Sequence, residues 1–496
     1  MCALTVYTNA KIYTMDDSLP IANSLAIFKG EIVDIGFNVE EKYLEAKVID
    51  LNGKVIVPGF IDSHIHLTSI AELKKWIDLK SVKSIEELKK VLKKHRELSN
   101  STWIIGRGFN EEQFDEKRLP TRCDLDEAVP DRPVVIIRIC GHIGVANTLA
   151  LKLLGFWNMR YEEHLSQGVL REKLLSEALN KIPKPSFEEL KILIKNTIEE
   201  LLSHGLTTVC SVSATPQEYL VLKETAKDII NVKLVPNIEH LEYFLKTANE
   251  KIEYLKIIGF KTFADGSFGG RTAALREPYN DEPENKGLLL LKHHEIRANI
   301  LKASKHGYML AVHAIGDRAI EEIVKAVKEY KALRKYLRIE HCSLTPPDII
   351  DELIENKPYA IVVQPHFRIS DWWLKDRIGS RVKWTYMFRT LLKNNFIVAS
   401  SSDAPVEPFN PLANMWASIS RKAIGECVSR KEALKMYTKY AAKALRETKV
   451  GVLRKGFKAD FVVLNDDIFK VSSNKLKRLR VETTVVKGKI VYRRNV

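Results

Sequence analysis

The sequence predicts an α/β protein built around an eight-stranded TIM barrel, and three observations support this prediction. Apolar runs of strand length recur along the chain, and each is followed by a segment with helical character. Such alternation is typical of parallel βα units, and eight units favour a TIM barrel. Both chain ends are instead rich in short β-prone runs. No Gly-x-Gly-x-x-Gly turn follows any of the strands, which argues against an open doubly wound sheet.

The two chain ends predict a small domain of their own. Residues 1–56 consist of short β-prone runs with turn residues between them, and residues 460–492 have the same character. A β-sandwich made from both ends would close its sheet edges by pairing across the chain termini. We therefore predict a composite β-sandwich domain formed by residues 1–57 and 445–496.

The barrel is predicted to occupy residues 58–444. Its eight strands are expected at residues 60–64, 206–210, 232–236, 260–264, 308–313, 337–341, 359–364 and 396–400. Region 68–200 has a mixed pattern, with capping-box helix starts at Ser84 and Ser186 and β-like runs between them. We expect this region to be a large α+β insertion after the first barrel strand.

Composition narrows the class of protein. The chain has 496 residues and 45% hydrophobic residues, which is typical of a well-packed globular protein. It contains no apolar run of the ~18 residues that a membrane span needs. The N-terminal stretch lacks the pattern of a signal peptide, so we expect a cytoplasmic protein that does not bind membranes. The six cysteines are scattered, without a Cys-x-x-Cys pair, which argues against a disulfide framework.

The formal net charge of +15 raises the question of an anionic partner. The lysines are interleaved with glutamates, however, as in residues 85–90, and this pattern is typical of solvated helix faces. No basic-aromatic stacking motif is present, so we expect no nucleic-acid partner. The expected partner is a small-molecule substrate, and a homo-oligomer is left open.

Two histidines end the first predicted strand. Pro58 and Gly59 precede the apolar run that carries His64 and His66. Alternate side chains of a strand point to the same face, so both imidazoles can reach one metal ion. Neutral imidazoles are good ligands of divalent metals. The alternative interpretation is a pair of polar residues at a strand end.

Four further polar residues fall at the carboxyl ends of predicted strands. Lys261 lies on the fourth strand, His313 and His341 end the fifth and sixth, and Asp403 follows the eighth. Each has a simpler interpretation by itself, since a strand-end histidine is often structural, Lys261 could pair with Asp265, and Asp403 could cap a helix. Because active sites of these barrels lie at this end, their joint placement with His64 and His66 predicts a metal site.

These stretches resemble the amidohydrolase superfamily, and within it the metal-dependent hydrolases similar to YtcJ and to N-substituted formamide deformylase. The matching segments are residues 58–66, 263–275, 313–319, 338–341 and 401–406. The resemblance spans nearly the whole chain, terminal sandwich included. It identifies the group and leaves the substrate open.

The resemblance implies two divalent metal ions, with zinc expected. The implied ligands are His64, His66 and Asp403 for one ion, and His313 and His341 for the other, with Lys261 between them. In this superfamily a strand-four lysine often carries a carbamate that bridges both ions. Burial lowers the pKa of a lysine, and the neutral amine can take up carbon dioxide. The sequence leaves open whether Lys261 is carbamylated and whether one ion or two are bound.

The implied activity is hydrolysis of an amide or other non-peptide C–N bond by a metal-activated hydroxide. Asp403 would take the hydroxide proton and pass it to the leaving nitrogen. Two alternatives remain, namely a deaminase of an aminated heterocycle and a non-catalytic regulator on a hydrolase fold. Lys261 counts against the deaminase, and the complete ligand set counts against the regulator. A Cys342–His341 nucleophile is disfavoured, because neighbours on a strand point to opposite faces.

Three residues are predicted to contact the substrate. His142 precedes Asn147 in a pattern that resembles the family's pocket region, although a turn with a capping Asn explains it equally well. Arg271 lies in the loop after strand four and could bind a carboxylate or carbonyl. His366 ends the seventh strand and is expected at the same rim.

Overall fold

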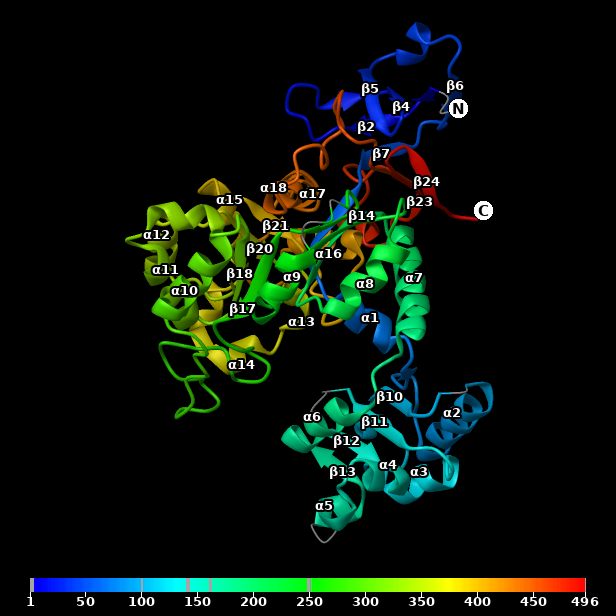
Figure 1. Cartoon of the computed structure of the whole chain (residues 1–496), viewed down its shortest axis with the longest axis vertical. Helices are drawn as coiled ribbons and strands as arrows, with labels where there is room; N and C mark the ends of the chain where they lie inside the picture. The colour runs from blue at the N-terminus through cyan, green and yellow to red at the C-terminus, as the bar shows by residue number, and fades with distance from the viewer. Residues whose placement is uncertain are drawn as a thin grey trace. The chain divides into compact units, whose positions relative to one another are not determined.

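The computed structural model describes residues 4–99, 101–139, 143–159, 163–247, 250 and 252–495 (Figure 1). The chain divides into two compact units, one formed by Met1–Ile70 with Ile194–Val496 and the other by Ala71–Leu193. The fold is of the α/β class, with helices between parallel strands through most of the first unit. Within the described residues, none of the helices combines the length and the apolar character needed to cross a membrane.

The strands of the two chain ends form two sheets. The first has the order β5-β4-β1-β6 and the second the order β24-β23-β22-β7-β2-β3. Their bounds are β1 Thr5–Thr8, β2 Lys11–Tyr13, β3 Ile21–Ala22, β4 Ser24–Phe28, β5 Glu31–Gly36, β6 Lys47–Asp50, β7 Val55–Pro58, β22 Phe461–Leu464, β23 Val481–Val486 and β24 Lys489–Arg493. The antiparallel pairing of β22 with β7 joins the two ends of the chain, with Phe461 opposite Pro58. One hydrophobic cluster includes Tyr7 and Ile27 from the first sheet and Phe461 from the second, so both ends share a core.

The strands predicted for the barrel are present and parallel. They form two sheets, with the orders β16-β15-β14-β8 and β17-β18-β19-β20-β21. Their bounds are β8 Phe60–Ile65, β14 Leu206–Val212, β15 Asn231–Val235, β16 Leu255–Ile257, β17 Gly259–Phe263, β18 Met309–Ala314, β19 Leu337–His341, β20 Ala360–Val363 and β21 Val398–Ser400. The short strand β16 lies outside the predicted set of eight.

Backbone contacts link the two parallel sheets at both edges. An isolated parallel bridge joins Asn237, just after β15, to Lys261 on β17. At the other edge the Asp403 amide donates to the His64 carbonyl at 2.9 Å, and the His66 amide donates to the Ala404 carbonyl at 2.8 Å. The carboxyl end of β8 is therefore tied to the segment that follows β21.

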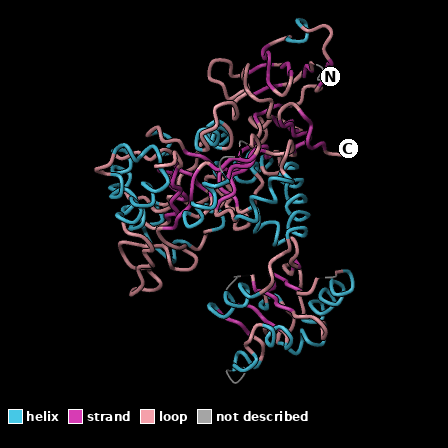
Figure 2. Tube along the Cα trace, in the orientation of Figure 1, coloured by secondary structure: helices cyan, strands magenta, loops and turns pink. Residues whose placement is uncertain are grey.

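Helices alternate with the parallel strands and continue after the last of them, β21 (Figure 2). Their bounds are α1 Leu67–Leu73, α7 Phe187–Ser203, α8 Pro216–Thr225, α9 Leu241–Thr247, α10 His293–Ser304, α11 Asp317–Val327, α12 Pro347–Glu355, α13 Phe367–Ser370, α14 Leu374–Ile378, α15 Phe388–Lys393, α16 Pro411–Ile419, α17 Arg430–Met436, α18 Lys439–Ala444 and α19 Ser473–Leu476. Helix α11 shows why they pack, because Ile320, Ile323 and Val327 recur at helical spacing and are buried.

The unit Ala71–Leu193 has a five-stranded sheet of the order β13-β12-β11-β10-β9. Its elements are β9 Ile77–Asp78, α2 Ile85–Leu98, β10 Ile104–Phe109, α3 Arg122–Ala128, β11 Val134–Arg138, β12 Ile143–Ala146, α4 Thr148–Leu153, α5 Glu163–Ser166, β13 Val169–Arg171 and α6 Glu172–Lys181. Ile136 packs in one hydrophobic cluster, and its neighbours Val135 and Ile137 pack in another. Because strand side chains alternate in direction, this division buries both faces of the sheet.

Candidate metal centre

Strand β8 carries His64 and His66 to its carboxyl end. All six of its residues, Phe60–Ile65, are buried. The carboxylate of Asp62 accepts hydrogen bonds from the backbone amides of His64 at 3.2 Å and Ser402 at 3.1 Å. Burial raises the pKa of Asp62 to about 7. Asp62 thus holds the end of β8 against the segment that follows β21.

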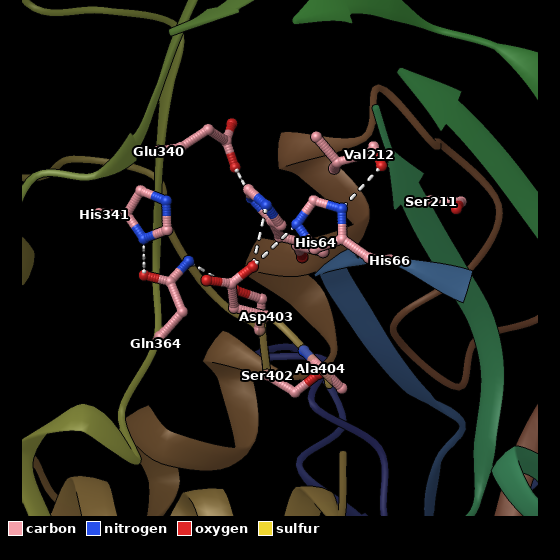
Figure 3. Close-up of polar contacts among 12 residues, drawn as sticks. His64, His66, Ser211, Val212, Glu340, His341, Gln364, Ser402, Asp403 and Ala404 are labelled. Carbon is pink, nitrogen blue, oxygen red and sulfur yellow. Dashed lines mark hydrogen bonds and ion pairs between the residues drawn. The ribbon is translucent and has the colours of Figure 1, made fainter. Parts of the chain in front are cut away.

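His64, His66 and Asp403 form a cluster with the spacing of a metal site (Figure 3). Asp403 Oδ1 lies 3.3 Å from His64 Nε2 and 3.1 Å from His66 Nε2. One ligand atom from each of the three residues lies within 4.8 Å of the other two. Asp403 has a φ of 58°, so a tight turn after β21 directs its carboxylate toward the two imidazoles.

The second nitrogen of each of these imidazoles has a fixed partner. His66 Nδ1 donates to the Val212 carbonyl at 3.0 Å, and His64 Nδ1 is hydrogen-bonded to the Glu340 carboxylate. A neutral imidazole that donates from Nδ1 carries its lone pair on Nε2, which is the arrangement of a metal ligand. Burial, together with the charge of Lys261, keeps the pKa of His64 well below its ordinary value. His64 is therefore a neutral imidazole with Nε2 available.

The partner of His64 belongs to a buried ion pair on β19. Glu340 accepts from the Arg338 guanidinium, and Arg338 Nη2 also donates to the Ser63 carbonyl at 3.0 Å. The sequence analysis missed Glu340, although a signal was present, since Arg338 and Glu340 share one face of a strand between apolar neighbours. Two opposite charges on the inner face of a buried strand indicate a buried ion pair.

His341 and His313 lie beside the cluster of His64, His66 and Asp403. The His341 ring centroid is 5.4 Å from that of His64 and 4.4 Å from that of His313. His341 Nδ1 is bound to Gln364 Oε1 at 2.7 Å, whereas its Nε2 is buried and has no hydrogen-bond partner among the residues that the structure describes. Gln364 is a second partner that the sequence analysis missed. A buried nitrogen with a free lone pair fits a metal ligand.

His313 has the opposite arrangement of its nitrogens. Its Nε2 donates to the Gly266 carbonyl at 2.9 Å, which leaves Nδ1 with the lone pair. Burial and the charge of Lys261 lower the pKa of His313 to about 3, so its ring is neutral. His313 and His341 lie outside the three-residue cluster, so the structure itself gathers three of the six predicted ligands at metal-ligand spacing.

Lys261 is buried on β17, with its Nζ 4.9 Å from the Phe263 ring centroid. Burial lowers the pKa of Lys261 to about 8. After burial, the charge of Lys261 is a further cause of the lowered pKa values of His64, His313 and His341. The alternative pairing with Asp265 is not formed.

The hydrogen bonds of Asp265 and the cap of the helix after Asp403 exclude two simpler interpretations, a pairing of Asp265 with Lys261 and a capping role of Asp403. The Asp265 carboxylate accepts from the backbone amides of Ala274, Ile315 and Gly316 at 2.8–3.0 Å, so its role is to hold these loops together. The helix after Asp403, α16, is capped by Asn410. Asp403 is therefore not a helix cap, and its carboxylate is free to face the histidines.

Cys342 lacks the properties of a nucleophile. It is buried, and burial raises the pKa of its thiol to about 12. A thiolate is the reactive form, and this thiol stays protonated at neutral pH.

The three residues predicted to contact the substrate have different surroundings. Arg271 is engaged by two carboxylates, with its Nη2 2.9 Å from Asp281 and its Nε 2.9 Å from Glu282. His366 directly precedes α13, and its Nδ1 is bound to Glu407. His142 lies outside the described residues. The prediction that His142, Arg271 and His366 contact substrate remains untested.

Asn147, the companion of His142 in the predicted pattern, has a structural role. Its side chain caps α4 by accepting from the Ala150 amide at 2.9 Å, and it also accepts from the Val134 amide at 3.0 Å. Its amide group donates to the carbonyls of Val129 and Arg132. These four bonds use the capacity of the side chain for internal contacts, so the capping interpretation holds for this residue.

Comparison with known proteins identifies the family. The model of the amidohydrolase family matches residues 47–492. YtcJ of Bacillus subtilis, assigned as an amidohydrolase, is 31% identical over 98% of each chain, and the N-substituted formamide deformylase of Arthrobacter pascens is 26% identical over 98% of each. A crystal structure of an uncharacterized metal-dependent hydrolase from Pyrococcus furiosus superimposes with a TM-score of 0.83 at 34% identity, covering 94% of this chain and 100% of that one. The chain belongs to the amidohydrolase family.

Proposed function

We propose that the protein is a metal-dependent hydrolase that cleaves an amide or other non-peptide C–N bond of a small molecule. The observation that carries the proposal is the cluster of His64, His66 and Asp403, in which both histidines keep their lone pairs on Nε2. Similarity over 98% of the chain to a formamide deformylase supports the choice of a C–N bond. We also propose that β8, β14, β15 and β17–β21 close into a TIM barrel beside a terminal β-sandwich.

The donor set fits divalent metal ions of the zinc type. Two imidazole nitrogens and one carboxylate oxygen are common zinc ligands, and the unpartnered His341 Nε2 offers a further nitrogen nearby. One ion would be held by His64, His66 and Asp403, and a second by His313 and His341, with Lys261 between them as a carbamate. A bound divalent ion supplies an acidified water and polarises the carbonyl of the substrate.

The side chains of this chain would carry the rest of the reaction. Asp403 Oδ1, which faces both imidazoles, would take a proton from the attacking water and transfer it to the leaving nitrogen. Glu340 and the Val212 carbonyl hold the two rings in one orientation, so the lone pairs keep their direction during the reaction. Because His64 and His313 have lowered pKa values, they stay neutral at pH 7 and do not compete for this proton.

The metal content of the purified protein tests the proposal, together with hydrolysis of a panel of small formamides, acetamides and esters. We expect about two ions per chain. His66→Asn should lose an ion and lower kcat by at least ~100-fold. The exposed His306 provides a matched control, since His306→Asn should change neither quantity. A protein that binds no divalent metal, or a His66→Asn variant with full metal content and full activity, would refute the proposal.

A further inference from the structure

A basic pocket lies outside the candidate metal centre, and the proposed function does not use it. The pocket has a volume of about 240 Å³, and its walls come from the end of α7, the start of α16 and the residues that flank β23 and β24. Helix α16 packs against α19, and the Thr484 hydroxyl on β23 donates to the Leu202 carbonyl on α7 at 2.6 Å. None of the six predicted metal ligands, all of which the structure describes, lines this pocket.

The side chains around this pocket carry positive charge without a carboxylate to balance it. Among the described residues that line the pocket none is acidic, and four are basic, namely Lys477, Arg478, Arg480 and Arg494. All four are exposed, and none forms an ion pair with a described residue. Elsewhere the chain pairs such charges, as where Lys435 and Lys439 both bind Asp17. Because like charges repel one another when no counter-ion is present, this pocket favours an anion.

The same concentration of charge is visible in the sequence. Residues 470–494 contain nine lysines and arginines and a single acidic residue, Glu482, which pairs with Lys54. This segment supplies more than half of the formal net charge of +15. The interleaving of lysine with glutamate that argues against an anionic partner in residues 85–90 is absent from it.

The hydrogen-bond donors of the pocket suit the oxygens of a phosphate. Arg494 Nε donates to the Val481 carbonyl at 3.1 Å, which leaves the two terminal nitrogens of the guanidinium without a partner among the described residues. Asn410 Oδ1 caps α16 by accepting from the Leu412 amide at 3.0 Å, and Asn410 Nδ2 likewise has no described partner. The paired N–H groups of a guanidinium match two oxygens of one phosphate. The amino end of α16, a helix of nine residues, adds a partial positive charge.

We propose that this pocket binds the diphosphate group of a small anion, with the guanidinium groups of Arg480 and Arg494 among its contacts. A phosphate monoester carries about 1.5 to 2 negative charges at pH 7, so two linked phosphates balance four cations better than one carboxylate does. The pocket is smaller than the roughly 300 Å³ at which sites for drug-sized ligands begin. It therefore takes the diphosphate and leaves any attached group in solvent. The inference does not depend on the proposed hydrolysis.

The test measures the binding of inorganic pyrophosphate to the full chain by calorimetry. We expect pyrophosphate to bind more tightly than inorganic phosphate, and acetate to bind least, because the charge of the anion falls in that order. ADP separates the two sources of the group, since its diphosphate has one end blocked by a nucleoside. Tighter binding of ADP indicates the end of a nucleotide, and tighter binding of pyrophosphate indicates the free anion. Either order supports the inference.

Variants of the two arginines separate the pocket from the overall charge of the protein. The pocket variant Arg480→Gln/Arg494→Gln should raise the Kd for pyrophosphate about 100-fold, since each charge-assisted hydrogen bond contributes about 10-fold. Arg480→Lys/Arg494→Lys keeps the charge but loses the paired donors, so it should recover part of the affinity. The control variant Arg421→Gln/Lys422→Gln removes two exposed cations that do not line the pocket. It should change the Kd less than about 3-fold, because distant surface charges are screened by salt.

Pyrophosphate also binds divalent metals, so the metal centre needs its own control. His66→Asn, which should lose an ion, is expected to keep the affinity of the wild-type protein for pyrophosphate. Binding that is lost in His66→Asn and kept in the pocket variant would assign pyrophosphate to the metal centre and overturn the inference.

The remaining outcomes separate this inference from the proposed function. A loss of pyrophosphate binding that is confined to the pocket variant supports the inference, whether or not the protein hydrolyses any amide. Absence of binding to the wild-type protein overturns it, and so do equal losses in the pocket variant and the control variant, which indicate attraction by net charge alone. A single-stranded oligonucleotide that binds the wild type more tightly than pyrophosphate, and does not bind the pocket variant, would assign the basic segment to nucleic acid instead.

Discussion

The ends of the parallel strands and the unit Ala71–Leu193 use polar side chains in different ways. At the strand ends His64, Lys261, Arg338 and Glu340 are all buried, and Glu340 pairs with both His64 and Arg338. In Ala71–Leu193 both faces of the sheet are packed with apolar side chains, and in a charged pair such as Lys89–Glu127 the lysine is buried but its carboxylate partner is exposed. Burying charge is costly unless partners compensate it. The free-energy cost of burying charge is therefore concentrated at the candidate metal centre.

The largest expected effect tests the fully buried pair Arg338–Glu340 against Lys89, whose carboxylate partners are exposed. Arg338→Met leaves Glu340 without its cation, and we expect a loss of about 3–5 kcal/mol in the free energy of unfolding. Lys89→Met removes a cation whose partners Glu86 and Glu127 are exposed, and it should cost less than about 1 kcal/mol. Urea unfolding of the two variants provides the measurement. Equal losses would remove the distinction between the two regions.

The next prediction concerns Lys261. Lys261→Ala should lower kcat by about 100-fold or more and reduce metal content, because the residue that we propose as a ligand of both ions is lost. Lys261→Glu, which supplies a carboxylate, should recover part of the metal content. Native mass spectrometry should show a carbon dioxide adduct on the wild-type protein and none on either variant. If Lys261→Ala keeps its metals and its activity, Lys261 is only a buried structural residue.

A cap in the unit Ala71–Leu193 should affect stability and leave the metal centre intact. Asn147→Ala removes the α4 cap and leaves the Val134 amide without an acceptor, so we expect a loss of about 1–3 kcal/mol. Metal content should not change. Thermal unfolding and metal analysis of the same sample check both statements. Weaker substrate binding at unchanged stability would instead favour a role of this residue in the pocket.

The smallest effects are in the pH dependence of stability, where Asp124 and Asp460 should contribute with opposite signs. In Ala71–Leu193, hydrogen bonds from Arg118 and Thr121 outweigh burial and lower the pKa of Asp124 to about 2 from its ordinary 3.8. Asp124 therefore contributes stability above pH 3.8, and the contribution is lost as the pH falls through about 2. Burial raises the pKa of Asp460 to about 6, so its contribution is present below pH 3.8 and is lost as the pH rises through about 6.

Two substitutions check these signs in chemical denaturation at a series of pH values. Asp460→Asn should remove the part of the stability loss that occurs between pH 3.8 and about 6. Asp124→Asn should remove part of the loss that occurs between pH 3.8 and about 2. Parallel stability profiles of the wild type and either variant over its window would contradict the assignment for that residue.

The hydrophobic pattern of the sequence was sufficient to predict the parallel strands and many residues of the candidate metal centre. Apolar runs located the parallel strands because strand length and alternation are local properties of sequence. The same reasoning placed His64, His66 and Asp403 at one rim, where the structure gathers them. The matching family segments extended this to an amidohydrolase, which the comparisons confirm. The substrate could not be predicted, because it depends on loops whose shape is not periodic.

The sequence by itself determined which residue types lie at the strand ends, since strand register follows from alternation. Only the tertiary structure decided which nitrogen of each histidine faces the centre, because that depends on partners far away in the chain. Glu340 lies 276 residues from His64, and the Val212 carbonyl lies 146 residues from His66. The structure likewise decided that Asp281 and Glu282 hold Arg271 and that Glu407 holds His366. Hydrogen-bond partners are a property of the folded chain, and they decide what each strand-end residue can do.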